Sequence, residues 1–581
     1  MKRAAFISSC LLFLAALAWS SRPAAVAEAI DFAPSMPHGA IVYLQARDFS
    51  AMLHDWNEST VKEDWLKSAN YKVFAESRLF LRLKEAQGQF AVAAGLPADV
   101  NFLVEGAGKQ SALALYDIGN LEFLYISKIA SSDAMQSALW QSRAKFGPRS
   151  AGGTPFYVRT DPASQRVVAF AIANDTLLLA TREELLAGAL EAMADGKEAR
   201  LSDEAWYHDA LGAAHEAGDL RLVLNLNELV KSPHFRSYWV QRNISEIRQY
   251  AASVSDLYRS GNTYREERVF LRNESVKTAA ATGKSTPAVT PQGQHAVAEL
   301  LTAVPAEAGF YRAVANPSPQ ESLALIVKKL LTPRTTSAPA STSAPSVQLS
   351  GGEVGSSADL ETKIDEPAVA VTTVKDQFAA LQEFLEKAGV LAQLQVQSTR
   401  QDTNTSFVRM HSAIVLASLN DWDGEAARAA LQSAVAGITT QGLGAGWRRN
   451  GKGSNEYFEL DGQFPLCLAE RGKYIVLSDR AELLNSFSFR PGKMAAVAEA
   501  VSSSGINFAR ESDNFAVLTR LLDNTTAAEN AASTDSPGEP PFFSGNLAGL
   551  SRVLSGVKSE SIVTRESGGK VLQTLTYQWN R

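Results

Sequence analysis

Apolar and polar residues change their spacing along the first half of the chain, and each change predicts a new element. Residues 40–46 read AIVYLQA, a short run typical of a strand, whereas residues 48–59 read DFSAMLHDWNES with helical spacing. Residues 72–95 again carry apolar side chains at helical spacing and end on Gly95, which favours a helix C-terminus. A strand followed by two helices is therefore expected here.

Strands joined by tight turns come next. Residues 111–118 and 121–129 are β-like runs separated by Gly119 and Asn120, a favoured hairpin turn. The following pattern predicts a helix at 133–146, a second hairpin at 155–175, a strand and helix at 176–193, a strand at 220–226, a long helix at 238–258 and a strand at 263–273.

Hairpins interleaved with helices predict an α+β fold, in which a mostly antiparallel sheet carries helices packed on one face. A doubly wound parallel sheet is the alternative. It fits worse, because hairpins stand where crossover connections would be needed.

Four stretches of the first half return later in looser form and in the same order, which predicts two tandem copies of one domain. The echoes join 36–53 with 304–323, 111–119 with 412–420, 177–186 with 475–484, and 224–229 with 545–550.

The domain map follows from these echoes and from composition. The expected parts are a leader at 1–29, a first α+β copy at 30–273, a flexible linker at 274–295 and a second α+β copy at 296–581. Two insertions in the second copy, at about 332–367 and 523–540, are rich in Ser, Thr, Ala and Pro. Such segments bury too little apolar surface to offset the entropy of ordering, so we expect them to be disordered.

The first residues have the pattern of a secretory signal peptide. Lys2 and Arg3 precede an apolar run from Ala4 to Trp19, and small residues around Ala27 suit cleavage. The run is shorter than the ~20 residues that span a bilayer, so cleavage is favoured over an uncleaved N-terminal anchor. We expect a periplasmic or secreted protein of bacterial type, with no membrane span in the mature chain.

Charge and cysteine content narrow the classes further. The formal net charge is −6, and loss of the basic leader makes it more negative, which argues against nucleic acid as a partner. Cys467 is the single cysteine outside the leader, so no intramolecular disulfide is expected. Stability must then come from the hydrophobic cores of two large domains.

One segment offers weak ligand-binding candidates. Residues 442–458 combine several glycines with Trp447, Arg448, Arg449 and Lys452. Backbone amides and basic side chains suit an anion, and an indole face suits a sugar ring or a cation. A structural loop between a helix and a strand is the alternative interpretation.

No motif of catalytic or metal-binding spacing is found. His208, His215 and His234 lack the spacing of a zinc site, and Asp421, Asp423 and Glu425 suit a helix cap better than a calcium loop. Cys467 stands in an apolar strand and is interpreted as a buried, unreactive thiol. We therefore predict no catalytic residue, no metal ligand and no cofactor site.

Aromatic residues after the first strand allow two interpretations. Their members are Trp56, Trp65, Tyr71, Phe74 and Phe80, at loosely helical spacing. They either fill a core or line an apolar groove that takes a lipid or a partner helix.

The openings of both halves, together with the hairpin at 111–115 and the strand and helix at 177–186, resemble a family of exported bacterial proteins of unknown function. In that family each copy begins with a "VPADALVYLEVRDL"-type segment. The resemblance implies export and α+β repeats. It implies no activity and no catalytic residues.

Together these patterns favour a non-enzymatic exported protein that binds or scaffolds an unknown protein or an apolar ligand. A periplasmic carrier of an apolar, lipid-like ligand and an enzyme with a site between the copies remain open alternatives. An apolar cavity would favour the carrier, and converging carboxylates and histidines would favour the enzyme.

Overall fold

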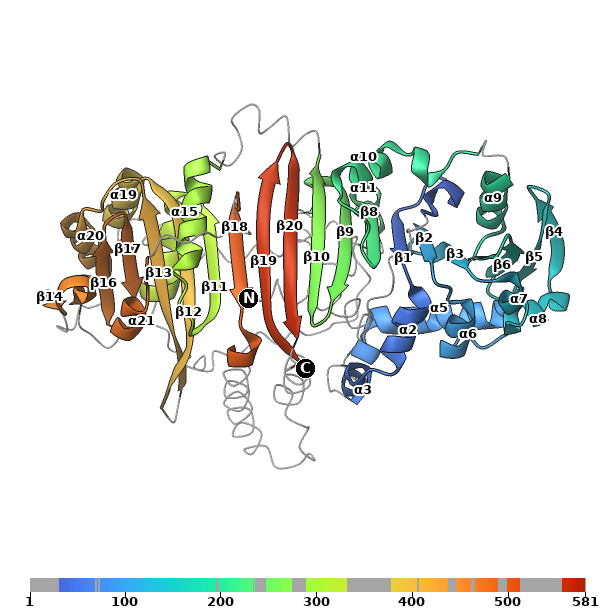
Figure 1. Cartoon of the computed structure of the whole chain (residues 1–581), viewed down its shortest axis with the longest axis horizontal. Coiled ribbons are helices and arrows are strands. Elements are labelled where there is room, and N and C mark those ends of the chain that lie inside the picture. Colours follow the sequence, from blue (N-terminus) through green and yellow to red (C-terminus); the bar gives the residue numbers. More distant parts are fainter. Residues whose placement is uncertain are drawn as a thin grey trace, which may run out of the picture. The chain divides into compact units, whose positions relative to one another are not determined.

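The computed structural model describes residues 31–67, 71, 74–194, 198–233, 235, 247–273, 289–331, 378–404, 407–436, 446–460, 465–489, 499–511 and 556–579 (Figure 1). The expected leader and both expected insertions lie outside these residues. The chain divides into two compact units, which consist of residues 1–287 with 522–581, and of residues 288–521.

Unit 1 contains an antiparallel sheet with neighbours in the order β4-β5-β6-β7-β3-β2-β1-β8-β9-β10-β20-β19. Its strands are β1 Val42–Ala46, β2 Ser111–Asp117, β3 Glu122–Lys128, β4 Gly147–Ala151, β5 Thr154–Thr160, β6 Val167–Ala173, β7 Thr176–Ala180, β8 Leu220–Asn225, β9 Tyr250–Ser260, β10 Thr263–Arg272, β19 Val557–Ser567 and β20 Lys570–Trp579.

The helices of unit 1 lie mainly between these strands in sequence. They are η1 Ala33–Ser35, α2 Phe49–Asn57, α3 Thr60–Lys67, α5 Arg78–Ala94, α6 Val100–Gly106, α7 Ser131–Ala134, α8 Ala138–Gln141, η2 Arg143–Lys145, α9 Glu183–Ala194, η3 Leu201–Asp203, α10 Ala205–Ala213 and α11 Leu226–Leu229. The α+β class with an antiparallel sheet, predicted from the hairpins, is thus confirmed.

Unit 2 contains an antiparallel sheet with the order β14-β15-β16-β17-β13-β12-β11-β18. Its strands are β11 Ala308–Ala315, β12 Val390–Asn404, β13 Phe407–Ser418, β14 Trp447–Asn450, β15 Tyr457–Leu460, β16 Leu466–Arg471, β17 Tyr474–Ser478 and β18 Ser502–Ile506. Its helices are α15 Pro291–Thr302, α16 Pro319–Ile326, the π-helix η4 Val327–Leu331, α19 Ala379–Ala388, α20 Gly424–Ala436, η5 Gly453–Asn455 and α21 Ala481–Asn485.

The order in unit 2 is the order β4-β5-β6-β7-β3-β2-β1-β8 of unit 1, strand for strand. Two of the sequence echoes fall on strands with the same place in both orders, namely β1 with β11 and β7 with β17. The echo between 111–119 and 412–420 joins strands with different places in the two orders. Residues 111–119 form β2, whereas 412–420 belong to β13, which has the place of β3 in unit 2. Neighbouring strands of one hairpin have similar apolar patterns, which explains the mismatch. Residues 545–550 lie outside the described residues, and β18 takes the place of β8.

Helices pack on both faces of the sheet in unit 1, so the expectation of helices on one face was wrong for this unit. In unit 1, Ala169 and Ala171 of β6 join a core with α9 and α10, while Val168 and Phe170 of the same strand join a core with α5 and α8. Figure 1 shows α9 and α10 on the side of the unit opposite to α2, α5 and α6. The cause is visible in β6 and β7, which are apolar at nearly every position and must be covered twice.

Three boundaries also differ from the sequence-based map. Residues 250–260, expected within a long helix, form β9, because they pair with β8 and β10. The end of the expected linker is helical, since α15 begins at Pro291 with Thr290 as its cap. Residues 556–579, expected in the second copy, belong to unit 1 by their contacts, because β20 pairs along its length with β10 (Figure 1).

Candidate functional site

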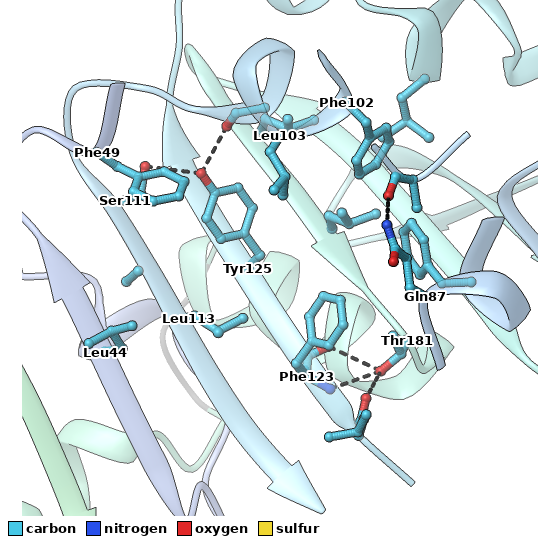
Figure 2. A pocket seen from close by; sticks show the side chains of 18 of the residues that line it. Leu44, Phe49, Gln87, Phe102, Leu103, Ser111, Leu113, Phe123, Tyr125 and Thr181 are labelled. Carbon is cyan, nitrogen blue, oxygen red and sulfur yellow. Dashed lines mark hydrogen bonds between the residues drawn. The ribbon is translucent and has the colours of Figure 1, made fainter. Parts of the chain in front are cut away.

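A cavity of about 500 Å³ lies in unit 1 between the sheet and the helices α2, α5, α6 and α8 (Figure 2). Its walls are almost entirely apolar. They are formed by Leu44, Ala46, Phe49, Met52, Leu83, Ala86, Gln87, Phe90, Ala98, Phe102, Leu103, Glu105, Gly106, Ser111, Ala112, Leu113, Leu121, Phe123, Tyr125, Ser137, Leu139, Arg166, Val167, Leu177, Leu179, Thr181 and Leu220.

The sheet forms one wall of the cavity. Leu44 of β1 pairs with Leu113 of β2, which pairs in turn with Tyr125 of β3. Paired residues of neighbouring strands point to the same face, so these side chains lie side by side across the sheet. Leu179 of β7 continues the row beside Tyr125. Figure 2 shows Leu44, Leu113 and Tyr125 along this wall.

Two capped helices form the opposite wall. The Ser77 hydroxyl accepts the N–H of Phe80 at the start of α5, and the Asp99 carboxylate accepts the N–H of Phe102 at the start of α6. Such caps satisfy N–H groups that have no partner within the helix. Phe90 of α5 meets Phe102 edge to face at 5.6 Å between ring centroids. The two helices thus present a joined aromatic surface to the cavity.

Polar groups in the wall are mostly engaged with the protein itself. The Tyr125 hydroxyl donates to the carbonyl of Gly106 at 2.8 Å and contacts the Ser111 hydroxyl at 3.1 Å. Burial raises the pKa of Tyr125, so its hydroxyl stays protonated. The Thr181 hydroxyl accepts the N–H of Phe123 at 2.8 Å, and the Gln87 amide donates to the carbonyl of Ala98. A ligand therefore meets mainly carbon.

The cavity opens toward solvent on its helical side. Leu83 of α5 and Leu103 of α6 both line it, yet 45% and 49% of their surfaces are exposed. Other large apolar side chains on these helices are also exposed, including Leu81, Val92 and Val104. A ligand could enter between α5 and α6 without any opening of the sheet.

The same face of unit 2 is more polar at the strands that correspond to β1 and β2. Where β1 and β2 pair Leu44 with Leu113, β11 and β12 pair Arg312 with Gln395. Gln393 and Gln397 follow on the same face of β12, and all three glutamines are buried. The Ser322 hydroxyl of α16 donates to the side-chain carbonyl of Gln393 at 2.9 Å. The apolar side chains that β1 and β2 contribute in unit 1 are thus replaced by polar ones on β11 and β12.

The weak ligand-binding candidates do not form one site. Trp447 on β14 is half-buried and its indole N–H donates to the carbonyl of Arg428 at 3.0 Å. The Arg449 guanidinium binds both carboxylate oxygens of Glu456 at 2.7 Å. Arg448 precedes it on the strand and therefore points to the opposite face. Lys452 is exposed beyond the strand.

The aromatic residues singled out from the sequence do not line the cavity. Trp65, Tyr71, Phe74 and Phe80 contact one another, with ring centroids 5.2–6.3 Å apart. The aromatic residues that do line the cavity come from four different elements, and sequence reasoning missed them. One signal for the cavity was present in the sequence, the run RLFLRL at 78–83. Its apolar residues cover a wider part of the helix surface than packing against one sheet requires.

Another group of candidates comprised three histidines and a cluster of carboxylates. Asp423 caps α20, where its carboxylate accepts the N–H of Ala426 at 3.0 Å. His234 lies outside the described residues. Within the described parts of the chain, no three His, Cys, Asp or Glu side chains lie where they could share a metal ion. Among the described helices, none is long and apolar enough to cross a membrane.

Cys467 is buried in β16, as its apolar neighbours predicted. It is 1% exposed, between Glu459 of β15 and Ser478 of β17, and α21 packs over β16. Burial, and next the carboxylates of Glu459 and Asp479, raise the pKa of the thiol to about 12. The reactive thiolate is therefore scarce at neutral pH.

We expect the Cys467 thiol to react slowly with a thiol reagent in the native protein and rapidly in denaturant. Cys467→Ala should lower the free energy of unfolding by about 1 kcal/mol, the centre of the usual range for point substitutions. A colorimetric thiol assay with and without guanidinium chloride measures the first effect, and chemical unfolding measures the second. Fast labelling of the folded protein would contradict the assignment and point to chemistry at this residue.

Comparisons with known proteins add little. No family model and no curated protein matches the chain. The solved structure titled "Structure of crystal form I of TP0453" matches 44% of this chain and 86% of its own, with 12% sequence identity and a TM-score of 0.23. A TM-score this low supports no statement about fold or function.

Proposed function

We propose that this chain is a non-enzymatic exported carrier, and that unit 1 holds an apolar, lipid-like molecule in the cavity beneath α5 and α6. The observation that supports it most is the cavity itself. Its volume of about 500 Å³ falls within the range of roughly 300–1,000 Å³ typical of small-molecule sites.

The lining favours binding over catalysis. A hydrophobic ligand gains free energy in proportion to the apolar surface it removes from water, and this wall offers carbon from sheet and helices alike. Its hydroxyl and amide groups already have protein partners, so few remain to orient a polar substrate. Catalysis would need titratable groups that converge on one point. Export is our inference from the leader alone.

The shared strand order supports a second part of the proposal, that the two units are copies of one domain. In that case the copies have diverged at the sheet face under the helices. Replacement of Leu44 and Leu113 by Arg312 and Gln395 would leave apolar binding to unit 1. The second copy then has a role other than holding this ligand.

A cavity-filling substitution tests the proposal. Ala86 lies on α5, lines the cavity and is half-buried, so Ala86→Trp places an indole in the space that the ligand would take. We expect binding of the neutral apolar fluorophore N-phenylnaphthylamine to weaken by at least about tenfold, equivalent to 1.4 kcal/mol. Fluorescence titration measures this directly.

Ala91→Trp is the matched control. Ala91 is half-buried on the same helix but does not line the cavity, so this variant should bind the fluorophore as the native protein does. Circular dichroism shows whether both variants keep their secondary structure. The carrier proposal is wrong if the two folded variants bind the fluorophore equally well, or if the native protein does not bind it.

A further inference from the structure

One guanidinium group lines the mostly apolar cavity. Arg166 directly precedes β6, after the turn that joins β5 to β6, and is half-buried. Its Nε donates to the side-chain oxygen of Gln89 on α5 at 2.9 Å. Its Nη1 donates to the carbonyl of Asn120 in the β2–β3 turn. Both acceptors are neutral, and together they hold the guanidinium at the cavity wall.

The charge of Arg166 is not compensated by an ion pair with any carboxylate of the described residues. Arg82 of α5 likewise forms no ion pair with a carboxylate of the described residues. Its guanidinium donates to the carbonyl of Gly119, next to Asn120. Two cationic groups therefore meet at adjacent carbonyls of one turn. Arg182, only one residue beyond the lining residue Thr181, differs from Arg166 in its ion pairs and in its place. It pairs with Glu122 at 3.0 Å and with Glu184 at 3.4 Å, and it does not line the cavity.

The other charged group of the wall does not offset Arg166 by direct contact. The Glu105 carboxylate accepts the N–H of Ala138 at the start of α8, at 2.8 Å, and so is held on the α6–α8 side. A partly desolvated cation with neutral acceptors gains most from an anionic acceptor, because charge-assisted hydrogen bonds are the stronger ones. Guanidinium geometry suits carboxylate and phosphate oxygens equally.

We propose that the ligand of this cavity is an anionic amphiphile, whose apolar chain lies against the sheet and α5 while its carboxylate or phosphate binds Arg166. This proposal rests on the carrier function and adds the chemical class of the ligand. The apolar wall accounts for the chain, and the uncompensated guanidinium beside it accounts for the anionic end. Selectivity among chains of equal length then comes from the head group.

Displacement of N-phenylnaphthylamine by ligands of equal chain length tests the proposal on the full chain. The ligands are oleate, oleoyl lysophosphatidate and the neutral oleyl alcohol. We expect at least one anion to bind about tenfold more tightly than the alcohol, and Arg166→Gln to abolish that advantage, in line with the loss of a charged hydrogen-bond partner. Which anion binds better identifies the head group as carboxylate or phosphate.

Two further variants make the result interpretable. Arg166→Lys keeps the charge and should retain part of the preference for the anion, whereas Arg182→Gln removes a nearby paired arginine and should leave the preference unchanged. Binding of the alcohol reports whether the cavity is intact in each variant. If the native protein binds alcohol and anions equally, or if Arg166→Gln keeps the preference, the head-group proposal is wrong while the carrier proposal stands. If no chain binds, the carrier proposal itself fails.

Discussion

Asp256→Ala is expected to lower the free energy of unfolding of unit 1 by about 3–5 kcal/mol, because it leaves a buried guanidinium without its counter-ion. Asp256 of β9 pairs across the strands with Arg221 of β8. Its two carboxylate oxygens accept hydrogen bonds from the Nε–H and Nη2–H groups of Arg221 at 2.7 and 2.8 Å. The Asp256 side chain is 3% exposed and that of Arg221 is 12% exposed. One carboxylate oxygen also accepts the N–H of Gly218 at 3.0 Å.

Chemical unfolding followed by circular dichroism measures this loss. Glu63→Ala is the control, since Glu63 pairs with Lys67 at 3.2 Å where both side chains are more than two-thirds exposed. Water and salt screen such a pair, which contributes about 0–1 kcal/mol. A similar small loss in both variants would show that solvent reaches the Arg221–Asp256 pair.

Leu124→Ala is expected to cost about 2–5 kcal/mol, the range for truncating a leucine in a filled core. Leu124 of β3 is fully buried and packs in the core that β3 shares with α9 and α10. The truncation removes apolar contacts and leaves a void, because close-packed neighbours relax only in part.

Leu113→Ala, on the neighbouring strand, should cost distinctly less than Leu124→Ala. Leu113 points to the other face of the sheet, where it borders the existing cavity and is only half-buried. Unfolding curves of the two variants compare them directly. An equal or larger loss for Leu113→Ala would mean that its side chain is packed as tightly as a core residue, and that the space beside it is filled.

Local patterns were enough to predict the elements whose apolar spacing is unambiguous. Alternation at 111–129 predicted the hairpin β2–β3, helical spacing with Gly95 predicted the end of α5, and LLLATREELL predicted β7 followed by α9. The apolar character around Cys467 predicted its burial. In each case the deciding interactions lie within one element or between neighbours in sequence.

Other elements depended on partners far away in the chain. Residues 250–260 alternate Ser253 and Ser255 with Ala252 and Val254, a strand pattern that resembles a helix when the preceding residues are included. Pairing with β8 and β10 decides in favour of β9. The helices that cover β6 and β7 on both faces of the sheet likewise come from separate parts of the chain, so tertiary packing determines this arrangement.

The sequence by itself determined the α+β class of this protein, the hairpin β2–β3, the strand and helix β7 and α9, and the burial of Cys467, since periodicity and turn chemistry act over a few residues. Only the tertiary structure determined where the apolar cavity lies. Leu44, Phe102 and Leu179 line one cavity because strands and helices distant in sequence meet there, and whether facing side chains fill a gap depends on their combined volumes. The place of Arg166 beside that cavity was decided in the same way, through the turn and the helix that hold its guanidinium.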